Sequence, residues 1–293
     1  MPDKMPTDKM PTDKMPTDKM LAERTPDDFP PDAHTRAYAI TRVFVRILMP
    51  LLGGITVRGA ENIPARGPVL LAINHRSYMD PPYLSMITGR QLHLMAKEQL
   101  FTIPVFGPYI RAMGAFPVKR GVADRGAIRQ AIDELKAGHV LGIFPEGTRA
   151  DPGTLLPAER GFALIAKQTR IPIVPVALEG TDKVHPKHAK RLHRAHVTAT
   201  IGRPVTAEEM LSANADPTKD ALTVIGEATT RMIAALMTEP VLILSASVPD
   251  KEAASRPDEA VPENKSEKKW LRLLTLSGIG VILLLAARSK RRR

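Results

Sequence analysis

A histidine and an aspartate five residues apart are the first side chains whose types and spacing suggest chemistry. His75 stands at the end of a short apolar run, residues 68–74, and Asp80 follows it. A carboxylate that holds one imidazole nitrogen leaves the other nitrogen to remove a proton from a hydroxyl group. Asp80 also has a structural explanation as a helix cap. It precedes Pro81, and an Asp followed by a Pro is common at the start of a helix. From the residues alone, both roles stay open.

A second group of reactive or polar residues ends another apolar run. The sequence Phe-Pro-Glu-Gly-Thr-Arg occupies residues 144–149, directly after the run that begins at Val140. Glycine allows close approach of the backbone to a ligand, and Thr and Arg donate hydrogen bonds to phosphate or carboxylate oxygens. A plain strand-to-loop turn with exposed charges is the alternative interpretation.

Together, in this order and about 70 residues apart, the two groups resemble the motifs of the glycerolipid acyltransferases. The closest resemblance is to the 1-acylglycerol-3-phosphate acyltransferases, and it covers about residues 40–235. The matching segments are His75 with Asp80, residues 95–101, residues 114–120, residues 144–149 and residues 173–176. Pro117 departs from the pattern of the third motif, where a strand favours a β-branched residue.

The resemblance implies an enzyme that moves an acyl group from a thioester, acyl-CoA or acyl carrier protein, to the sn-2 hydroxyl of 1-acylglycerol-3-phosphate. The product would be phosphatidic acid, a step of phospholipid biosynthesis. His75 would act as the base and Asp80 would orient it. The sequence contains no Gly-x-Ser-x-Gly segment and no cysteine, which agrees with direct transfer without an acyl-enzyme. No metal and no cofactor beyond the acyl donor is implied. Asn74 or a backbone N–H is expected to serve the oxyanion.

The same resemblance assigns a second set of residues to the acceptor. Arginines at positions 120 and 149 suit a phosphate through paired charge-assisted hydrogen bonds. Glu146 is expected to orient an arginine or the glycerol hydroxyl, because a carboxylate does not bind phosphate directly. The expected acceptor-binding residues are Arg120, Glu146, Gly147, Thr148 and Arg149.

The elements that must position these groups alternate between apolar runs and helical patterns. This alternation predicts an α/β fold with a largely parallel central sheet flanked by helices, and function is expected where strands end. Strands are predicted at 68–74, 92–96, 112–118, 140–144, 171–178 and 196–202, and helices at 34–52, 121–137, 158–169 and 219–237.

The chain is expected to have four parts. Residues 1–33 contain the repeat MPTDK and are predicted to be disordered, residues 34–246 form the acyltransferase domain, and residues 247–269 form a linker. In the tail, 270–293, eighteen mostly apolar residues precede a run of arginines. Eighteen helical residues span about 27 Å against roughly 30 Å of hydrocarbon. Membrane association of this tail helix is favoured over a packed amphipathic helix.

The first predicted helix, 34–52, has two interpretations. Arg42 and Arg46 share one face of it, and Val43 and Ile47 belong to an apolar flank. It is either an ordinary core-packing helix or a helix that lies in a membrane interface with its arginines at headgroup level. The membrane-interface interpretation of this helix, together with the tail, predicts an enzyme associated with the cytoplasmic face of a membrane.

Composition and charge narrow the class of protein. The chain has 293 residues, 43% of them hydrophobic, and no cysteine, which excludes a disulfide scaffold and thiolate metal sites. The net charge of +11 comes from both the body and the tail, so lipid headgroups, a phosphorylated substrate or nucleic acid are possible partners. With 4% aromatic residues, base stacking is disfavoured. The alternatives are a glycerol-3-phosphate or other lysolipid acyltransferase, and a non-catalytic basic protein that binds membranes or nucleic acid.

Overall fold

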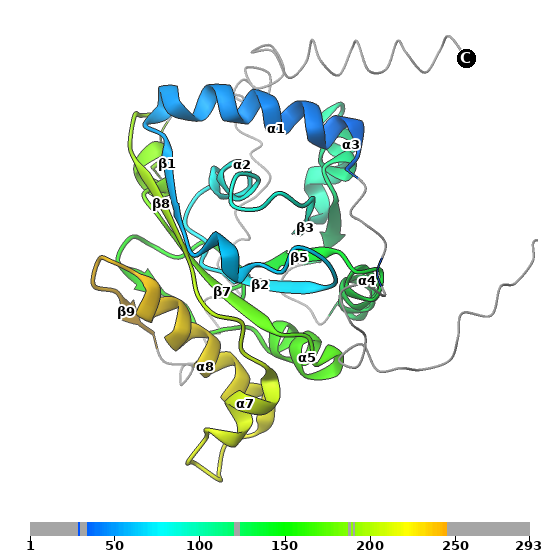
Figure 1. Cartoon of the computed structure of the whole chain (residues 1–293), viewed down its shortest axis with the longest axis vertical. Helices are drawn as coiled ribbons and strands as arrows, with labels where there is room; N and C mark the ends of the chain where they lie inside the picture. The colour runs from blue at the N-terminus through cyan, green and yellow to red at the C-terminus, as the bar shows by residue number, and fades with distance from the viewer. Residues whose placement is uncertain (1–28, 30–33, 120–123, 187–188, 190, 245–293) are drawn as a thin grey trace, which may run out of the picture.

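A seven-stranded sheet runs through the middle of the molecule (Figure 1). The computed structural model describes residues 29, 34–119, 124–186, 189 and 191–244. In spatial order the strands are β1 (Ile55–Arg58), β8 (Val197–Ile201), β7 (Ile173–Glu179), β2 (Val69–Ile73), β5 (Val140–Ile143), β3 (Leu92–Lys97) and β4 (Ala115–Val118). Neighbouring strands are parallel except β7 and β8. The predicted α/β fold with a largely parallel sheet is therefore confirmed.

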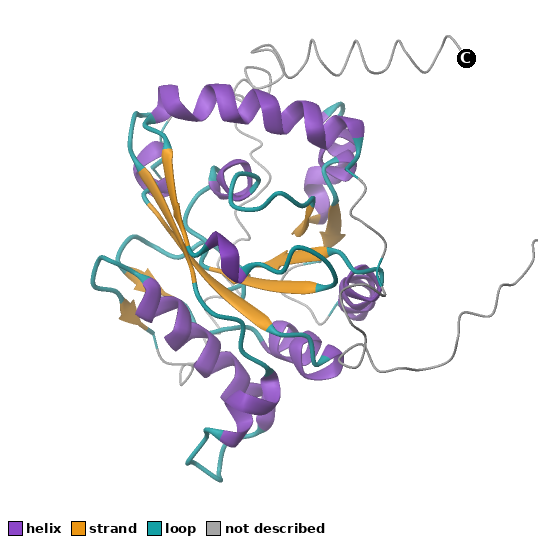
Figure 2. Ribbon diagram, in the orientation of Figure 1, coloured by secondary structure: helices purple, strands orange, loops and turns teal. Residues whose placement is uncertain are grey.

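Helices cover both faces of the sheet (Figure 2). One face carries α1 (Arg36–Leu48) and α2 (Asp80–Leu84), and the other carries α4 (Arg125–Lys136), α5 (Arg160–Thr169) and α8 (Ala221–Leu236). The shorter elements are η3 (Met49–Leu52), η4 (Ala60–Asn62), η5 (Glu98–Thr102), α3 (Phe106–Ala112), β6 (Thr154–Leu155), α6 (Thr181–Val184), α7 (Ala207–Ser212) and β9 (Leu242–Ile243).

The central strand β2 shows why its residues form a two-sided core. All five of its side chains are buried. Successive side chains of a strand point to opposite faces, so Leu71 and Ile73 pack with α1 and α2 while Leu70 and Ala72 pack with α4, α5 and α8. A continuous apolar run is what a strand covered on both faces requires, and the sequence prediction rested on that pattern.

Helix α1 lies within the predicted helical segment 34–52, and one side of it packs against the core. The Thr35 side chain accepts a hydrogen bond from the Tyr38 N–H and caps the helix start, and Pro50 lies where the α-helix gives way to η3. Tyr38 and Val45 are buried. Within the predicted apolar flank, Val43 and Ile47 face outward and are 59% and 67% exposed, whereas Leu48 packs against the core.

Two sequence features that looked irregular fit this sheet. Strand β1 was not predicted, because its four residues, Ile55–Arg58, mix apolar and polar types and lie at a sheet edge. Pro117 lies in β4, which pairs with β3 and is the opposite edge of the sheet among the described residues. An edge strand tolerates the missing N–H of proline, so this departure from the family pattern leaves the strand intact.

The predicted linker, 247–269, and the predicted tail helix, 270–293, lie outside the described residues. Within 1–33 the structure describes Phe29, which is buried against Gly138. The disorder expected for 1–33 as a whole stays a prediction. None of the helices within the described ranges combines the length and the apolar character needed to cross a bilayer.

Candidate active site

The side chains of His75 and Asp80 meet at the carboxyl end of β2. His75 Nδ1 lies 2.7 Å from Asp80 Oδ2, and both side chains are buried. The same carboxylate oxygen accepts hydrogen bonds from the backbone N–H groups of Arg76, at 2.9 Å, and Ser77, at 3.0 Å. The five-residue spacing therefore wraps a tight loop around one carboxylate oxygen, and the imidazole is held through Nδ1.

Asp80 does not act as a helix cap. It is the first residue of α2, the N-cap residue is Met79, and no side chain caps this helix. The donors to Asp80 come from the preceding loop and from His75, not from the N–H groups of the first turn. Of the two roles left open by the spacing, the geometry favours the orientation of His75.

The Asn74 side chain bonds to the backbone of the neighbouring strand β7. Its side-chain amide donates to the Leu178 carbonyl at 2.9 Å and its oxygen accepts from the Leu178 N–H at 2.7 Å. The ladder between β2 and β7 ends at Ile73 and Val176, so the Asn74 side chain continues it by one step. One N–H of the Asn74 amide is thus bonded to Leu178, and the choice between Asn74 and a backbone N–H as oxyanion donor stays a prediction.

The Phe144–Arg149 segment lies beside this loop because β2 and β5 are adjacent and parallel. The Phe144 ring stacks on the His75 imidazole, with centroids 4.0 Å apart and an interplanar angle of 19°. The His75 N–H donates to Glu146 Oε1 at 2.8 Å, and the His75 carbonyl accepts from the Ala150 N–H. The two segments that the sequence paired by resemblance are in direct contact.

Glu146 is anchored to the backbone on both sides. It is 6% exposed, and its second oxygen accepts the Leu156 N–H at 2.9 Å. Each carboxylate oxygen therefore accepts one backbone N–H, and its expected role toward an arginine or the glycerol hydroxyl stays a prediction. Burial raises the pKa of Glu146 to about 7, although the two N–H donors oppose that rise.

The remaining residues of the segment turn toward the outside. Gly147 has φ +66°, and a Cβ atom there would approach the Glu159 side chain to 3.0 Å, so glycine is required. Thr148 is exposed. The Arg149 guanidinium lies 3.8 Å from the centroid of the Tyr78 ring, which is a cation–π contact.

Tyr78 and His185 extend the surface next to Arg149. Their ring centroids are 6.3 Å apart, and burial, followed by the charge of Arg149, lowers the pKa of His185. Sequence analysis assigned Tyr78 no role. An aromatic residue inside the His-x4-Asp loop was the signal that could have suggested a partner for the arginine. Arg120 lies outside the described residues.

The comparisons with known proteins fit this arrangement. A family model described as Acyltransferase matches residues 54–179, from the start of β1 to the end of β7. A 1-acyl-sn-glycerol-3-phosphate acyltransferase of Bacillus subtilis is 31% identical over 191 residues, which are 64% of this chain and 91% of that protein. The chain belongs to the acyltransferase family.

Other members of the family show how far the likeness extends. A 1-acyl-sn-glycerol-3-phosphate acyltransferase of Streptococcus pneumoniae is 32% identical over 174 residues, 58% of this chain and 62% of that protein. The chain spans 44% of a chloroplastic relative from Brassica napus. The crystal structure of a 1-acyl-sn-glycerophosphate acyltransferase from Thermotoga maritima matches with a TM-score of 0.55 and 26% identity, over 69% of this chain and 81% of that one.

The buried Glu146 carboxyl predicts a pH-dependent stability. Its pKa is about 7 in the folded protein against an ordinary 4.5, so folding binds this proton more tightly. The stability it contributes is full below about pH 4.5 and is lost as the pH rises to about 7, a loss of at most about 3 kcal/mol. We expect the free energy of unfolding in urea to fall between pH 4.5 and pH 7.5 in the parent by more than it does in Glu146→Gln. Glu159→Gln, at an exposed position, should run parallel to the parent. Parallel curves for Glu146→Gln would contradict the expected ionisation.

Proposed function

We propose that this acyltransferase moves an acyl group from a thioester to the sn-2 hydroxyl of 1-acylglycerol-3-phosphate, giving phosphatidic acid. The observation that carries the proposal is the 2.7 Å contact between His75 Nδ1 and Asp80 Oδ2 beside the Phe144–Arg149 segment. The relatives from Bacillus subtilis and Streptococcus pneumoniae, both 1-acyl-sn-glycerol-3-phosphate acyltransferases by name, support the choice of acceptor.

The chemistry requires one base and one developing oxyanion. His75 Nε2 takes the proton of the acceptor hydroxyl while its oxygen attacks the thioester carbonyl carbon. The carbonyl oxygen becomes an oxyanion, for which we propose a backbone N–H as donor. When the intermediate collapses, the C–S bond breaks and the leaving thiolate takes the proton from the imidazolium. No acyl-enzyme forms, because a thioester is already activated.

Asp80 has two tasks in this scheme. It fixes the Nδ1–H tautomer of His75, so that Nε2 is the basic nitrogen, and it stabilises the imidazolium that forms. The backbone N–H groups of Arg76 and Ser77 hold the carboxylate oxygen in place. The Phe144 ring restricts the imidazole from its face. Base, orienting carboxylate and stacking ring are thus held before substrate binds.

The phosphate of the acceptor is assigned to the arginine side of the site. Arg149 offers a planar fork of donors to phosphate oxygens, and Tyr78 holds the guanidinium from its face. Arg120 is proposed as a second phosphate ligand, with Gly147 and Thr148 next to the acceptor. Glu146 supports the site by accepting a hydrogen bond from the His75 backbone N–H. The donor is proposed to be acyl-CoA or acyl carrier protein, with no further cofactor.

The lipid nature of acceptor and product suggests a protein held at a membrane, on its cytoplasmic face. The outer side of α1 presents Val43 and Ile47, and Arg46 is exposed beside them. Arg42 donates instead to the Gly89 carbonyl and is half-buried. We assign this side of α1 to the lipid surface, where apolar side chains enter the interface and arginine meets headgroups.

Acyl transfer by the purified full chain tests the proposal. We expect labelled acyl-CoA or acyl carrier protein plus 1-acylglycerol-3-phosphate to give phosphatidic acid by chromatography. Asp80→Asn should lower kcat by about 10²–10⁴-fold, the usual contribution of general base catalysis, because a carboxamide does not stabilise an imidazolium. Unchanged melting would show that the fold is retained. Acylation of glycerol-3-phosphate alone would move the activity to that acceptor, and a fully active Asp80→Asn would remove Asp80 from the mechanism.

Arg149→Lys separates the phosphate contact from the rest of the site. Lysine keeps the charge but loses the planar fork and its stacking on Tyr78, so KM for the acceptor should rise about tenfold while KM for the thioester stays within about twofold. Arg231→Lys, on exposed α8 surface, is the matched control. A change confined to the thioester KM would contradict the assignment of Arg149 to the phosphate.

The membrane surface is tested with the double variant Val43→Ser, Ile47→Ser in the full chain. Both side chains are exposed, so folding should be unaffected, whereas binding to phosphatidylglycerol vesicles should fall by roughly tenfold or more because apolar burial is lost. Leu242→Ser removes an equally exposed apolar side chain on the other side of the sheet (Figure 1) and is the control. Equal vesicle binding by the parent and the double variant would contradict a lipid-facing α1.

A further inference from the structure

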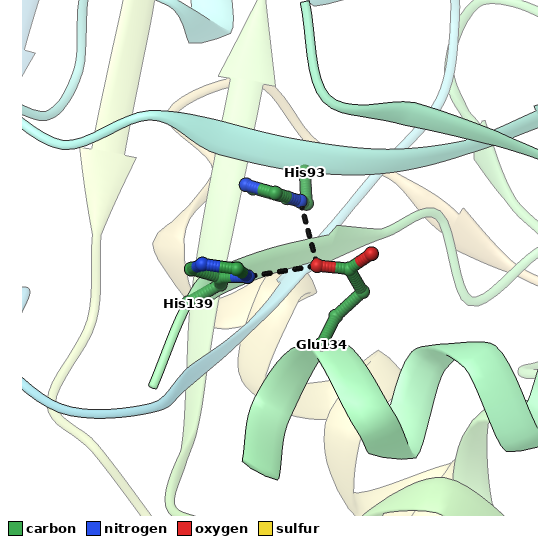
Figure 3. A group of neighbouring side chains, drawn as sticks. All are labelled: His93, Glu134 and His139. Atoms are coloured by element: carbon green, nitrogen blue, oxygen red, sulfur yellow. Dashed lines mark hydrogen bonds and ion pairs between the residues drawn. The ribbon is translucent and has the colours of Figure 1, made fainter. Parts of the chain in front are cut away.

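Three titratable side chains outside the active site converge on one point (Figure 3). His93 lies near the start of β3, Glu134 lies in the last turn of α4, and His139 directly precedes β5. Glu134 Oε2 is 2.9 Å from His93 Nδ1 and 2.8 Å from His139 Nδ1. The two imidazole rings stack in parallel, with centroids 4.3 Å apart and an interplanar angle of 13°. All three side chains are partly exposed.

The electrostatics of this cluster favour a cation. A carboxylate in the last turn of a helix faces the negative end of the helix dipole, which is unfavourable unless positive charge compensates it. Both imidazoles lie within hydrogen-bond distance of the same oxygen of Glu134, so three ligand atoms surround one point. A single divalent ion between these atoms would supply the compensating positive charge.

The backbone fixes the three positions relative to one another. Strands β3 and β5 are parallel neighbours, with Leu92 opposite Val140 and His93 opposite Leu141. The His139 N–H donates to the Glu134 carbonyl, which ties the end of α4 to the start of β5. The ligand atoms are therefore held by regular elements and one short turn rather than by a long loop.

We propose that His93, Glu134 and His139 form a site for a divalent transition metal of the zinc class. Two imidazole nitrogens and one carboxylate oxygen are ligands that zinc favours, and water would complete a tetrahedral set. Each neutral imidazole would carry its proton on Nε2 so that Nδ1 binds the ion. Ligand atoms around tetrahedral zinc at roughly 2.0–2.1 Å lie about 3.3–3.4 Å apart. The present contacts would thus open by about half an ångström, and the two stacked rings would turn so that both Nδ1 lone pairs point to the ion.

The site is separate from the catalytic end of the sheet. His139 precedes β5 and Phe144 follows it, so the four residues of β5 lie between the two sites, a distance of roughly 13 Å. A metal ion here does not reach the reacting atoms. It would join β3, α4 and β5, the strand that leads into the Phe144–Arg149 segment, and would act on stability. This proposal does not depend on the identity of the lipid acceptor.

Titration of the tag-free full chain, freed of metal by chelation, tests the site. We expect Zn²⁺ to bind one site by calorimetry and to raise the melting temperature, because an ion that binds only the folded state stabilises it. Co²⁺ should give the visible absorption of a four-coordinate nitrogen and oxygen site, and Mg²⁺ should have no effect. Since changes around a metal ligand already cost about 10–100-fold in affinity, Glu134→Gln and His93→Gln should each weaken binding at least about tenfold.

His34→Gln is the matched control, because His34 is an exposed histidine that precedes α1 and its loss should leave the affinity unchanged. Circular dichroism of the metal-free variants separates lost binding from lost folding. Should Glu134→Gln destabilise the chain too much, His139→Gln repeats the comparison from the most exposed ligand. Zinc affinity equal in parent and variants, or no Zn²⁺ binding below about 1 mM by a folded chain, would overturn the proposal and leave the cluster as an ion-pair network.

Discussion

The hydrogen bond from the His75 N–H to the Glu146 carboxylate connects the two halves of the active site. His75 follows β2 and Glu146 follows β5, and only the parallel register of these strands brings both loops to the same edge. A bond between a backbone N–H and a buried carboxylate fixes the path of the chain at His75 rather than the position of its ring. The ring is then set by Asp80 and Phe144. Orientation of the base thus depends on contacts from three separate loop positions.

A buried carboxylate at this place has an energetic cost. Removing Glu146 from water favours its neutral form, which the raised pKa expresses, while the two backbone N–H groups favour the ion. A glutamine is a poor substitute, because its NH₂ group would face one of the two N–H donors. The residue type is explained by this geometry without any contact to substrate. Glu146 holds the backbone of His75, the proposed base, and does so at the expense of stability near neutral pH.

The sequence predicted the sheet well because its central strands are buried on both faces. Short continuous apolar runs such as 68–74 and 171–178, which end in polar residues, are typical of strands covered on two sides. Edge strand β1 was missed, because its mixed residues give no local pattern, whereas the direction of Val43 was left open between the core and a membrane interface. In the site, the pairing of His75 with Asp80 was expected. The partners of Glu146 and of Asn74 were not, because they depend on backbone groups that only the folded chain brings near.

The fold contains two histidine–carboxylate arrangements, and their differences indicate their chemistry. Asp80 receives one imidazole and two backbone N–H groups in a buried loop, so a single ring is locked and its far nitrogen is directed to chemistry. Glu134 receives two imidazoles through their Nδ1 atoms at a partly exposed helix end, where the two rings stack on each other. The first geometry isolates one basic nitrogen from water. The second gathers three ligand atoms toward one point that an ion can reach. The same pair of residue types thus suits the proton transfer that we propose after β2 and the metal binding that we propose before β5, and burial together with the number of shared donors distinguishes the two arrangements.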